Sequence, residues 1–300
     1  MSTQAIAKIA DLNAKYDVIL FPPVGEETNP SMILEGLPTA WGNALPWMNT
    51  RETPNLGKND STPDMRPGLA WEGAAKLQQF VAKGGVLLTA TDTSQFALAI
   101  GLGNGVSAGS SEKMKVVGAV VGTRVVDAAS PIAYGYDDRI PAYCDDGPIF
   151  SVNNVVTPPH HHHESKERAT GRGTKDDPDF VVGRAATEAP EEPEHEQWEV
   201  PVPTDEQLNN NPTVIPPGDR PRVIVRYADA KDLLISGLAD GGNEIAQHPA
   251  VVDVPSGSGH VILFSVNPIY RGETEGTYSL VLNAVLQFDS LNAGRKNAER

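Results

Sequence analysis

The residues GLAWEGAAKLQQFVAKGGVLLTATD, 68–92, carry the strongest fold signal in this chain. The first part predicts an amphipathic helix, because apolar side chains recur at helical spacing and Gly84 and Gly85 stop the helix. The second part, residues 86–92, is a continuous apolar run that is typical of a buried parallel strand. We expect the inner face of the helix to hold Trp71, Ala74, Leu77, Phe80 and Val81.

The same pattern continues on both sides of this stretch. YDVILFP, residues 16–22, predicts a buried strand that follows a short helix over residues 3–14, and SQFALAIGLG, residues 94–103, predicts another helix. Two β-branched segments, residues 116–127 and 222–228, add strand material, and the first has no clear place in the sheet. Strands and helices that alternate through tight connections indicate an α/β fold with a doubly wound, mostly parallel sheet.

The C-terminal part predicts a hairpin and a closing helix. Residues 251–266 read as a strand, a Ser-Gly-Ser-Gly turn and a second buried strand. Residues 274–288 predict an amphipathic helix. Its inner face is expected to hold Tyr278, Leu282, Val285 and Leu286. By contrast, residues 24–68 show no periodicity and predict a long loop.

These elements predict one domain built from residues 1–152 and 220–290. The intervening residues, 153–219, are rich in His, Glu and Pro and poor in apolar residues, which favours a mobile, disordered insertion. Residues 291–300 read as a polar, frayed tail.

Composition narrows the classes of function. The formal net charge is −15, so a nucleic-acid backbone would be repelled. No apolar run approaches the 18 residues that a membrane span needs, and the N-terminus lacks the apolar core of a signal peptide. The single cysteine, Cys144, excludes an internal disulfide and says little about the compartment.

Three stretches together resemble one family: YDVILFPP (16–23), residues 66–102 and GSGHVILFSVNPIYRGETEGTYSLVLNAVL (257–286). They are similar to class I glutamine-amidotransferase-like domains, and more narrowly to the version C-terminal to the catalytic domain in bacterial zinc carboxypeptidase-like peptidases of the carboxypeptidase A superfamily. The closing motif, residues 270–278, is the most specific part.

The resemblance carries several implications for this chain. It implies a flavodoxin-like sheet, and a peptidase domain of the same or a neighbouring chain as partner. It implies no cofactor here, because zinc would sit in a missing N-terminal peptidase domain. The parent protein would be secreted or periplasmic, with its signal on that missing part. The start of the chain, one short helix before the first core strand, fits this interpretation.

The family places a Cys nucleophile in GxCxGxQ after the second strand and a His after a later strand. Here the residues at that turn are 89–95, TATDTSQ, so that Thr91 takes the nucleophile position and Asn267 the His position. A Thr hydroxyl is a poor nucleophile without a base beside it, and Asn cannot take a proton. The resemblance therefore implies that both positions are degenerate and that this chain alone is not an enzyme. We expect Asp92 and Ser94 to N-cap the following helix.

An alternative function uses the same end of the sheet. Open α/β sheets bind ligands in the crevice at the carboxyl ends of their strands. The candidate ligand residues there are Asp92, Thr93, Arg271 and Thr274. RGETEGT, 271–277, is either an anion or partner site at a helix N-terminus or a helix start capped by Thr274. The alternative is thus a stand-alone small-molecule-binding protein or an unusual hydrolase.

The remaining polar residues give weaker signals. His161–Glu164 satisfies the HxxE spacing of zinc peptidases but lies in a four-His run, so we expect at most incidental metal binding there. That run is His160, His161, His162 and His163. We expect Cys144 to be half-buried rather than reactive, and we expect His195 to be solvated, His248 to lie in a loop and His260 to pack at the hairpin turn. None of these three histidines has an evident partner.

Overall fold

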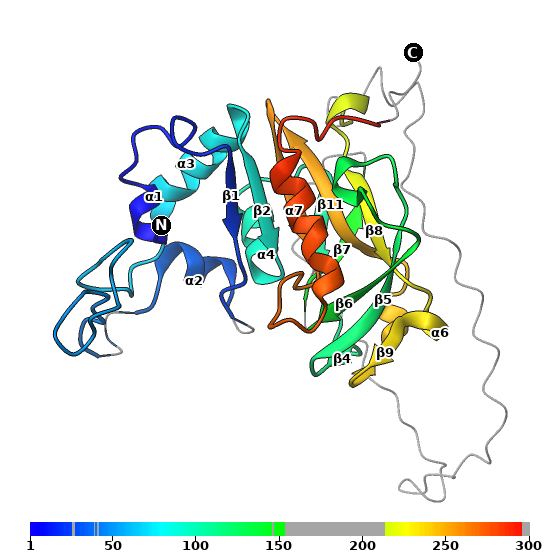
Figure 1. Cartoon of the computed structure of the whole chain (residues 1–300), viewed down its shortest axis with the longest axis horizontal. Coiled ribbons are helices and arrows are strands. Elements are labelled where there is room, and N and C mark those ends of the chain that lie inside the picture. Colours follow the sequence, from blue (N-terminus) through cyan, green and yellow to red (C-terminus); the bar gives the residue numbers. More distant parts are fainter. Residues whose placement is uncertain (26–27, 39, 41, 146, 154–213, 296–300) are drawn as a thin grey trace, which may run out of the picture. The chain divides into compact units, whose positions relative to one another are not determined.

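The computed structural model describes residues 1–295 apart from 26–27, 39, 41, 146 and 154–213. Its main sheet has eight strands: β1 (Val18–Phe21), β2 (Val86–Ala90), β5 (Ala119–Val125), β6 (Arg139–Cys144), β8 (Arg222–Tyr227), β9 (Leu234–Ser236), β11 (Pro249–Ser256) and β12 (Gly259–Phe264). The strand order is β1-β2-β12-β11-β8-β5-β6, with β9 also paired to β5 (Figure 1). The fold is therefore α/β with a mixed sheet.

The parallel part of the sheet contains β1, β2 and β12. Leu88 of β2 pairs with Leu20 of β1 and with Ile262 of β12, in parallel on both sides. The pairs β12–β11, β11–β8, β8–β5 and β5–β6 are antiparallel, so the parallel arrangement that we expected is limited to three strands. The predicted hairpin is confirmed, since Ser256 pairs with Gly259 across a two-residue turn. This turn reverses the chain, which makes β11 antiparallel to β12.

The predicted helix before β2 is α3 (Ala70–Ala82). Ala74, Leu77, Phe80 and Val81 are buried as expected, but Trp71 is 70% exposed. The side chain of Leu69 lies against Gly73, where a Cβ would come within 2.6 Å of it, and so covers the first turn. Leu69 therefore takes the buried place that we assigned to Trp71.

The closing helix, α7 (Tyr278–Leu286), presents a different face to the core from the one predicted. Leu280, Val281 and Ala284 are buried, whereas Leu282, Val285 and Leu286 are 55%, 36% and 73% exposed. The helix is apolar on nearly all sides, so the sequence pattern does not fix its rotation. Asn283 fixes it, because its Nδ2 donates to the carbonyl oxygens of Ile132 and Tyr134 at 3.0 and 2.8 Å.

Two N-terminal predictions are also corrected. The helix expected over residues 3–14 is only α1 (Thr3–Ile6), and the chain then turns so that Nδ2 of Asn13 donates to the carbonyl oxygen of Phe80 at 2.9 Å. The region expected to be a loop contains α2 (Pro30–Glu35). Oδ1 of Asn29 accepts from the Met32 N–H at 3.0 Å, and Pro30 takes the first helical position.

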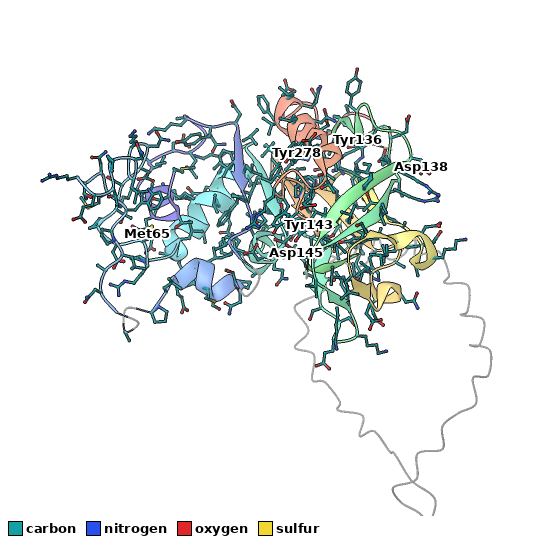
Figure 2. All side chains as sticks on the ribbon, turned by 60° about the horizontal axis from the view of Figure 1, so that its bottom comes forward. Met65, Tyr136, Asp138, Tyr143, Asp145 and Tyr278 are labelled. Carbon is teal, nitrogen blue, oxygen red and sulfur yellow. The ribbon has the colours of Figure 1, made fainter. Side chains whose placement is uncertain are left out.

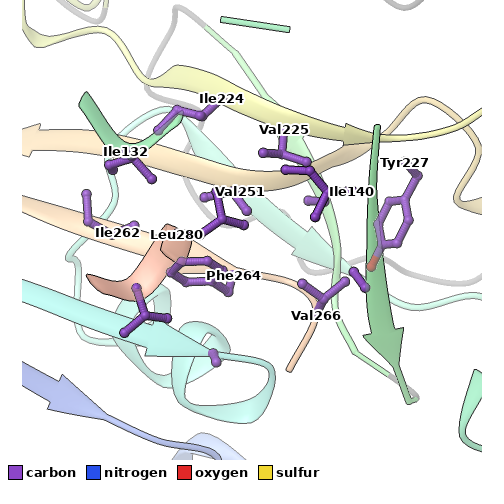
Figure 3. Close-up of a cluster of buried hydrophobic side chains, with 14 of the residues drawn as sticks. Ile132, Ile140, Ile224, Val225, Tyr227, Val251, Ile262, Phe264, Val266 and Leu280 are labelled. Carbon is purple, nitrogen blue, oxygen red and sulfur yellow. The ribbon is translucent and has the colours of Figure 1, made fainter. Parts of the chain in front are cut away.

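The remaining elements are short. They are α4 (Asp92–Ala99), α6 (Ala230–Leu233), the strand pairs β3 (Val106–Gly109) with β7 (Ile149–Val152) and β4 (Lys115–Val116) with β10 (Ala239–Asp240), and the 3-10 helices η2 (Pro131–Ala133), η3 (Pro217–Asp219), η4 (Gly242–Glu244) and η5 (Glu275–Thr277). Figure 3 shows the buried side chains of the main core, including Ile262 and Phe264 of β12 and Leu280 of α7. Within the described ranges, no helix has the length and apolarity to cross a bilayer. The predicted insertion lies outside the described residues except for 153 and 214–219.

Candidate functional site at the carboxyl end of β2

Thr91 alone connects β2 to α4. Its backbone has φ 51° and ψ −114°, a conformation that side-chain-bearing residues rarely adopt. The Thr91 N–H donates to the carbonyl oxygen of Phe264 at the end of β12, at 2.8 Å. This is a sharp, strained turn from strand to helix, the geometry that exposes a nucleophile in enzymes with a nucleophile elbow. We call this turn at Thr91 the elbow. It forms without the glycines of the GxCxGxQ pattern.

Asp92 holds the loop after β1 against this elbow. Its Oδ1 accepts from the Thr91 hydroxyl at 3.0 Å, and its Oδ2 accepts from the N–H groups of Val24 and Gly25 at 3.0 and 3.1 Å. The predicted N-cap role is wrong, because Thr91 is the N-cap residue and Asp92 is the first residue of the helix. The carboxylate oxygens are thus occupied by structural hydrogen bonds.

The hydroxyls that follow Asp92 are fully buried and tie the strand ends together. The Thr93 hydroxyl donates to the carbonyl oxygen of Phe21 at 2.8 Å and accepts from the Ala90 N–H at 3.0 Å. Oγ of Ser94 donates to the carbonyl oxygen of Phe264 at 3.0 Å, so Ser94 is not a helix cap either. These contacts explain Thr93 and Ser94 as residues that join β1, β2 and β12.

Asn267 lies three residues beyond β12 and is 8% exposed. Its N–H donates to the carbonyl oxygen of Tyr143 at 3.2 Å, and its Oδ1 accepts from the Ile269 N–H at 3.3 Å. In the part of the chain that the structure describes, no hydrogen bond joins Asn267 to the Thr91 hydroxyl. The residue at the expected position of the base therefore serves the local turn.

The segment after β6 covers the elbow. A Cβ added to Gly147 would lie 2.0 Å from the Ser265 carbonyl oxygen and 3.8 Å from Cγ2 of Thr91, so the main chain there packs closely over both. Thr91 is only 7% exposed. Little of its side chain is therefore open to a substrate.

Arg271 and Thr274 belong to a separate turn. The ring of Tyr270 stacks on Tyr143 with centroids 3.9 Å apart, and the Arg271 guanidinium lies 5.2 Å from the Tyr270 centroid. Figure 2 labels Tyr143 beside Asp145, at the end of β6. Thr274 is buried and precedes η5, but its side chain makes no capping bond, and its hydroxyl lies 3.3 Å from that of Thr277.

The predicted crevice set is therefore divided. Among the described residues, Thr91, Asp92 and Thr93 form one group at the elbow, and no hydrogen bond connects them to Arg271 or Thr274. A pocket of about 500 Å³ is lined by residues 1–4, Trp47, Asn55, residues 57–62 and Met65, and another of about 830 Å³ lies beside β8; neither is lined by the elbow residues. Within the described ranges, the elbow residues and the turn of Arg271 and Thr274 are therefore not joined into one polar site.

The sequence analysis missed a group of buried charged side chains. It lies near the turn of the β11–β12 hairpin, at the end of the sheet away from the elbow. Oδ1 of Asp253 lies 2.7 Å from Nδ1 of His260, and Oδ2 of Asp253 lies 2.7 Å from Nη2 of Arg295. The signal was available, because the hairpin pairs Pro255 with His260 and so places Asp253 diagonally across from His260 on one face. His260 therefore has a partner, and the start of the predicted polar tail is tied to the sheet.

Of the other predicted polar residues, Cys144 and His248 lie in the described part of the chain, and both have partners. Cys144 is fully buried rather than half-buried, with Sγ 3.2 Å from the Asp145 carbonyl oxygen and 3.9 Å from the Tyr227 hydroxyl. Burial, with the nearby Cys144 as a smaller cause, raises the pKa of Tyr227 well above its ordinary value. His248 has a partner, since its Nδ1 lies 2.9 Å from the Phe150 carbonyl oxygen.

The metal predictions fall mostly on residues that the structure does not describe. The four-His run and His195 lie there. Among the described residues, no group of three or more His, Cys, Asp or Glu side chains is placed to share a metal ion.

Comparison with known proteins gives only distant likenesses. No protein-family model matches the chain, and no curated protein matches it. Among solved structures, the cytoplasmic protein STM3548 from Salmonella typhimurium is 10% identical with a TM-score of 0.41, over 96% of this chain and 79% of that one. A ThuA-like protein from Bacteroides uniformis is 10% identical with a TM-score of 0.33, over 76% and 67% of the two chains.

A β-galactosidase from Bacillus circulans is 10% identical with a TM-score of 0.32, over 72% of this chain. The present chain spans only 20% of the length of that enzyme. At such identities and TM-scores the likenesses define neither a family nor an activity. Nothing in them links the chain to a carboxypeptidase.

Proposed function

We propose that this chain is a non-catalytic accessory module of the glutamine-amidotransferase-like type, with its flavodoxin-like part formed by β1, β2 and β12. The observation that supports the proposal is the set of side-chain contacts at the elbow. The Thr91 hydroxyl is buried and bonded to Asp92, and the position expected for the base holds Asn267. A hydroxyl needs a base free to take its proton, but the Asp92 carboxylate beside it also holds the N–H groups of Val24 and Gly25. No imidazole among the described residues is hydrogen-bonded to the hydroxyl, so we infer that the elbow keeps a catalytic shape without a working base.

The partner of the module would be a peptidase domain, as the sequence resemblance implies. The parent would then be a zinc metallocarboxypeptidase-like protein that is secreted or periplasmic, with zinc bound in its own N-terminal domain. The outer face of α7 supports a partner of some kind, because it exposes the three apolar side chains of Leu282, Val285 and Leu286 at helical spacing. Such clustered exposed apolar residues mark surfaces that other proteins cover.

The native context tests this proposal. The reading frame upstream of Met1 in the source genome would be sequenced, and the native protein would be sized by immunoblot. A continuous frame with a peptidase domain and a band far above 32.0 kDa is the expected result. A stop codon upstream, a band near 32 kDa and no co-purifying peptidase would contradict the peptidase partnership.

The α7 face can be tested in the same cells. The double substitution Leu282→Ser and Leu286→Ser should disrupt packing against the partner domain, so that limited proteolysis separates the two. The matched control is Leu238→Ser, because Leu238 is 64% exposed and lies outside α7. Equal protease resistance of the double variant and the control would show that α7 is not the contact surface.

A second candidate function is a stand-alone small-molecule-binding protein or unusual hydrolase that uses Thr91. The strained backbone of Thr91 favours it, since strain of this kind persists at functional sites in many proteins. A hydrolysis reaction that depends on Thr91 would select this candidate over the first.

A further inference from the structure

Arginines line the pocket of about 830 Å³ beside β8. The pocket is formed by the segment after β5, by η3 with β8 up to Arg226, and by residues 292 and 295. Four of its thirteen lining residues are arginines: Arg220, Arg222, Arg226 and Arg295. One acidic side chain, that of Asp127, lines it among the described residues. This lining contrasts with a chain whose net charge is −15.

Two of the arginines are held in place by carboxylates. Arg222 donates to both Oδ atoms of Asp127, at 2.6 and 3.0 Å, and to the Ala293 carbonyl oxygen at 2.7 Å. Arg295 donates to Oδ2 of the buried Asp253 at 2.7 Å and to the Arg220 carbonyl oxygen at 2.9 Å. The cationic wall is therefore a fixed part of the fold and not a set of loose surface side chains.

Some guanidinium hydrogen atoms on this wall have no acceptor in the described part of the chain. Nη2 of Arg220 and Nε of Arg295 are buried there without a hydrogen-bond partner, although Nε of Arg220 donates to the Ile215 carbonyl oxygen at 3.2 Å. Buried polar groups in folded proteins almost always find a partner, and an unsatisfied donor costs free energy. Both arginines line the pocket, and neither nitrogen has an acceptor within the described residues.

We propose that this pocket is a binding site for a small, multivalent oxyanion. Guanidinium groups present planar pairs of donors that match the oxygens of phosphate and carboxylate groups. The pocket volume lies in the range that small ligands occupy. The site is on the opposite side of β11 from the parallel strands and depends on none of the elbow residues, so it stands or falls separately from the proposed function.

Calorimetric titration of the full chain tests the proposal, with pyrophosphate and citrate as separate probes at a constant ionic strength set with sodium chloride. The expected result is saturable binding of at least one probe at one site per chain, and a higher melting temperature with the probe bound. Tighter binding of pyrophosphate would identify a phosphoryl ligand, and tighter binding of citrate a polycarboxylate. Absence of saturable binding of either probe would overturn the proposal.

Variants locate the site. Arg220→Gln combined with Arg226→Gln should weaken binding roughly tenfold or more, because each change removes charged hydrogen-bond donors. Arg222 and Arg295 are left unchanged, since both pair with aspartates that hold the fold. The matched control is Arg139→Gln, on the exposed side chain of a residue in β6. Equal binding by the double variant and the control would overturn the proposal.

Single variants keep the test decisive if the double variant does not fold. Arg220→Gln and Arg226→Gln would then be titrated separately, after their circular dichroism spectra are compared with that of the unchanged protein. Arg220→Lys keeps the charge but removes the planar donor pair, so we expect affinity between that of Arg220→Gln and the unchanged protein. Unchanged affinity in both single Gln variants would place the anion elsewhere.

Discussion

The Thr91 hydroxyl donates to Oδ1 of Asp92 over 3.0 Å, while the other carboxylate oxygen of Asp92 accepts from two backbone N–H groups of the loop after β1. Thr91 also holds a backbone conformation with φ 51°. The backbone of the elbow is therefore strained, and the carboxylate beside its hydroxyl is already hydrogen-bonded to the loop after β1.

Replacing Thr91 separates backbone strain from side-chain contacts. Thr91→Gly should leave the protein more stable than Thr91→Ala by about 1 kcal/mol, since glycine adopts positive φ without the cost that alanine carries there. Urea denaturation of the two variants measures the difference in the free energy of unfolding. If Thr91→Ala were the more stable, residue 91 would not hold a positive φ in solution.

Asp92 should matter for stability through its hydrogen bonds to the loop after β1. Asp92→Ala removes the acceptor for the N–H groups of Val24 and Gly25, and we expect a loss of about 1–3 kcal/mol in the free energy of unfolding. Asp137→Ala serves as the control, because Asp137 is exposed. Equal stabilities of the two variants in urea would contradict the anchoring role of Asp92.

The buried Asp253 should be far more sensitive than a surface carboxylate. Asp253→Ala leaves the Arg295 guanidinium, whose side chain is 13% exposed, without its carboxylate partner and removes the hydrogen bond to His260. Breaking a buried pair from one side costs about 3–5 kcal/mol. A thermal or chemical denaturation series would measure this loss, and a loss below about 1 kcal/mol would show that the pair is exposed to solvent.

Tyr227 should make the protein sensitive to alkaline pH. Because burial raises its pKa in the folded state, its contribution to stability is complete below about pH 10 and declines above it, as the unfolded chain ionises first. The decline is about 1.4 kcal/mol per pH unit for one such group. Burial also raises the pKa of Tyr136. Tyr136 therefore adds to the loss of stability at alkaline pH in every variant, in the same direction as Tyr227.

Tyr227→Phe isolates this contribution. The variant should lose less stability than the unchanged protein between pH 9.5 and 11, although it is less stable at pH 7 because it lacks the hydrogen bond to Ser265. Urea denaturation at several pH values gives both curves. Parallel curves would mean that the Tyr227 hydroxyl ionises as easily in the folded protein as in the unfolded chain.

Local patterns in the sequence predicted the parts of the fold that depend on neighbouring residues. Helical periodicity located α3, a continuous apolar run located β2, and the Ser-Gly-Ser-Gly turn located the hairpin of β11 and β12. The rotation of α7 could not be predicted, because apolar residues surround the helix and the contact of Asn283 with the η2 segment decides which face is buried. The periodicity of the helix sequence does not indicate a long-range contact of this kind.

In the candidate site, too, local features could be predicted and long-range contacts could not. The order of strands and the family pattern placed Thr91 at the elbow, but the roles of Asp92 and Ser94 depend on contacts with the ends of β1 and β12, far away in sequence. The arginine pocket brings together residues from three separate segments, so no motif could indicate it. The pair of Asp253 and His260 is the exception, since the hairpin register alone places the two residues on one face.

Whether the elbow is catalytic is tested by the rate of hydrolysis by the purified chain, compared with that of Thr91→Ala. Ammonia release from glutamine and hydrolysis of p-nitrophenyl acetate would be followed for both proteins at pH 7.5. We expect both proteins to hydrolyse each substrate at the rate of the buffer. A rate above buffer that falls at least tenfold in a folded Thr91→Ala variant would contradict the non-catalytic role and show that the elbow is catalytic.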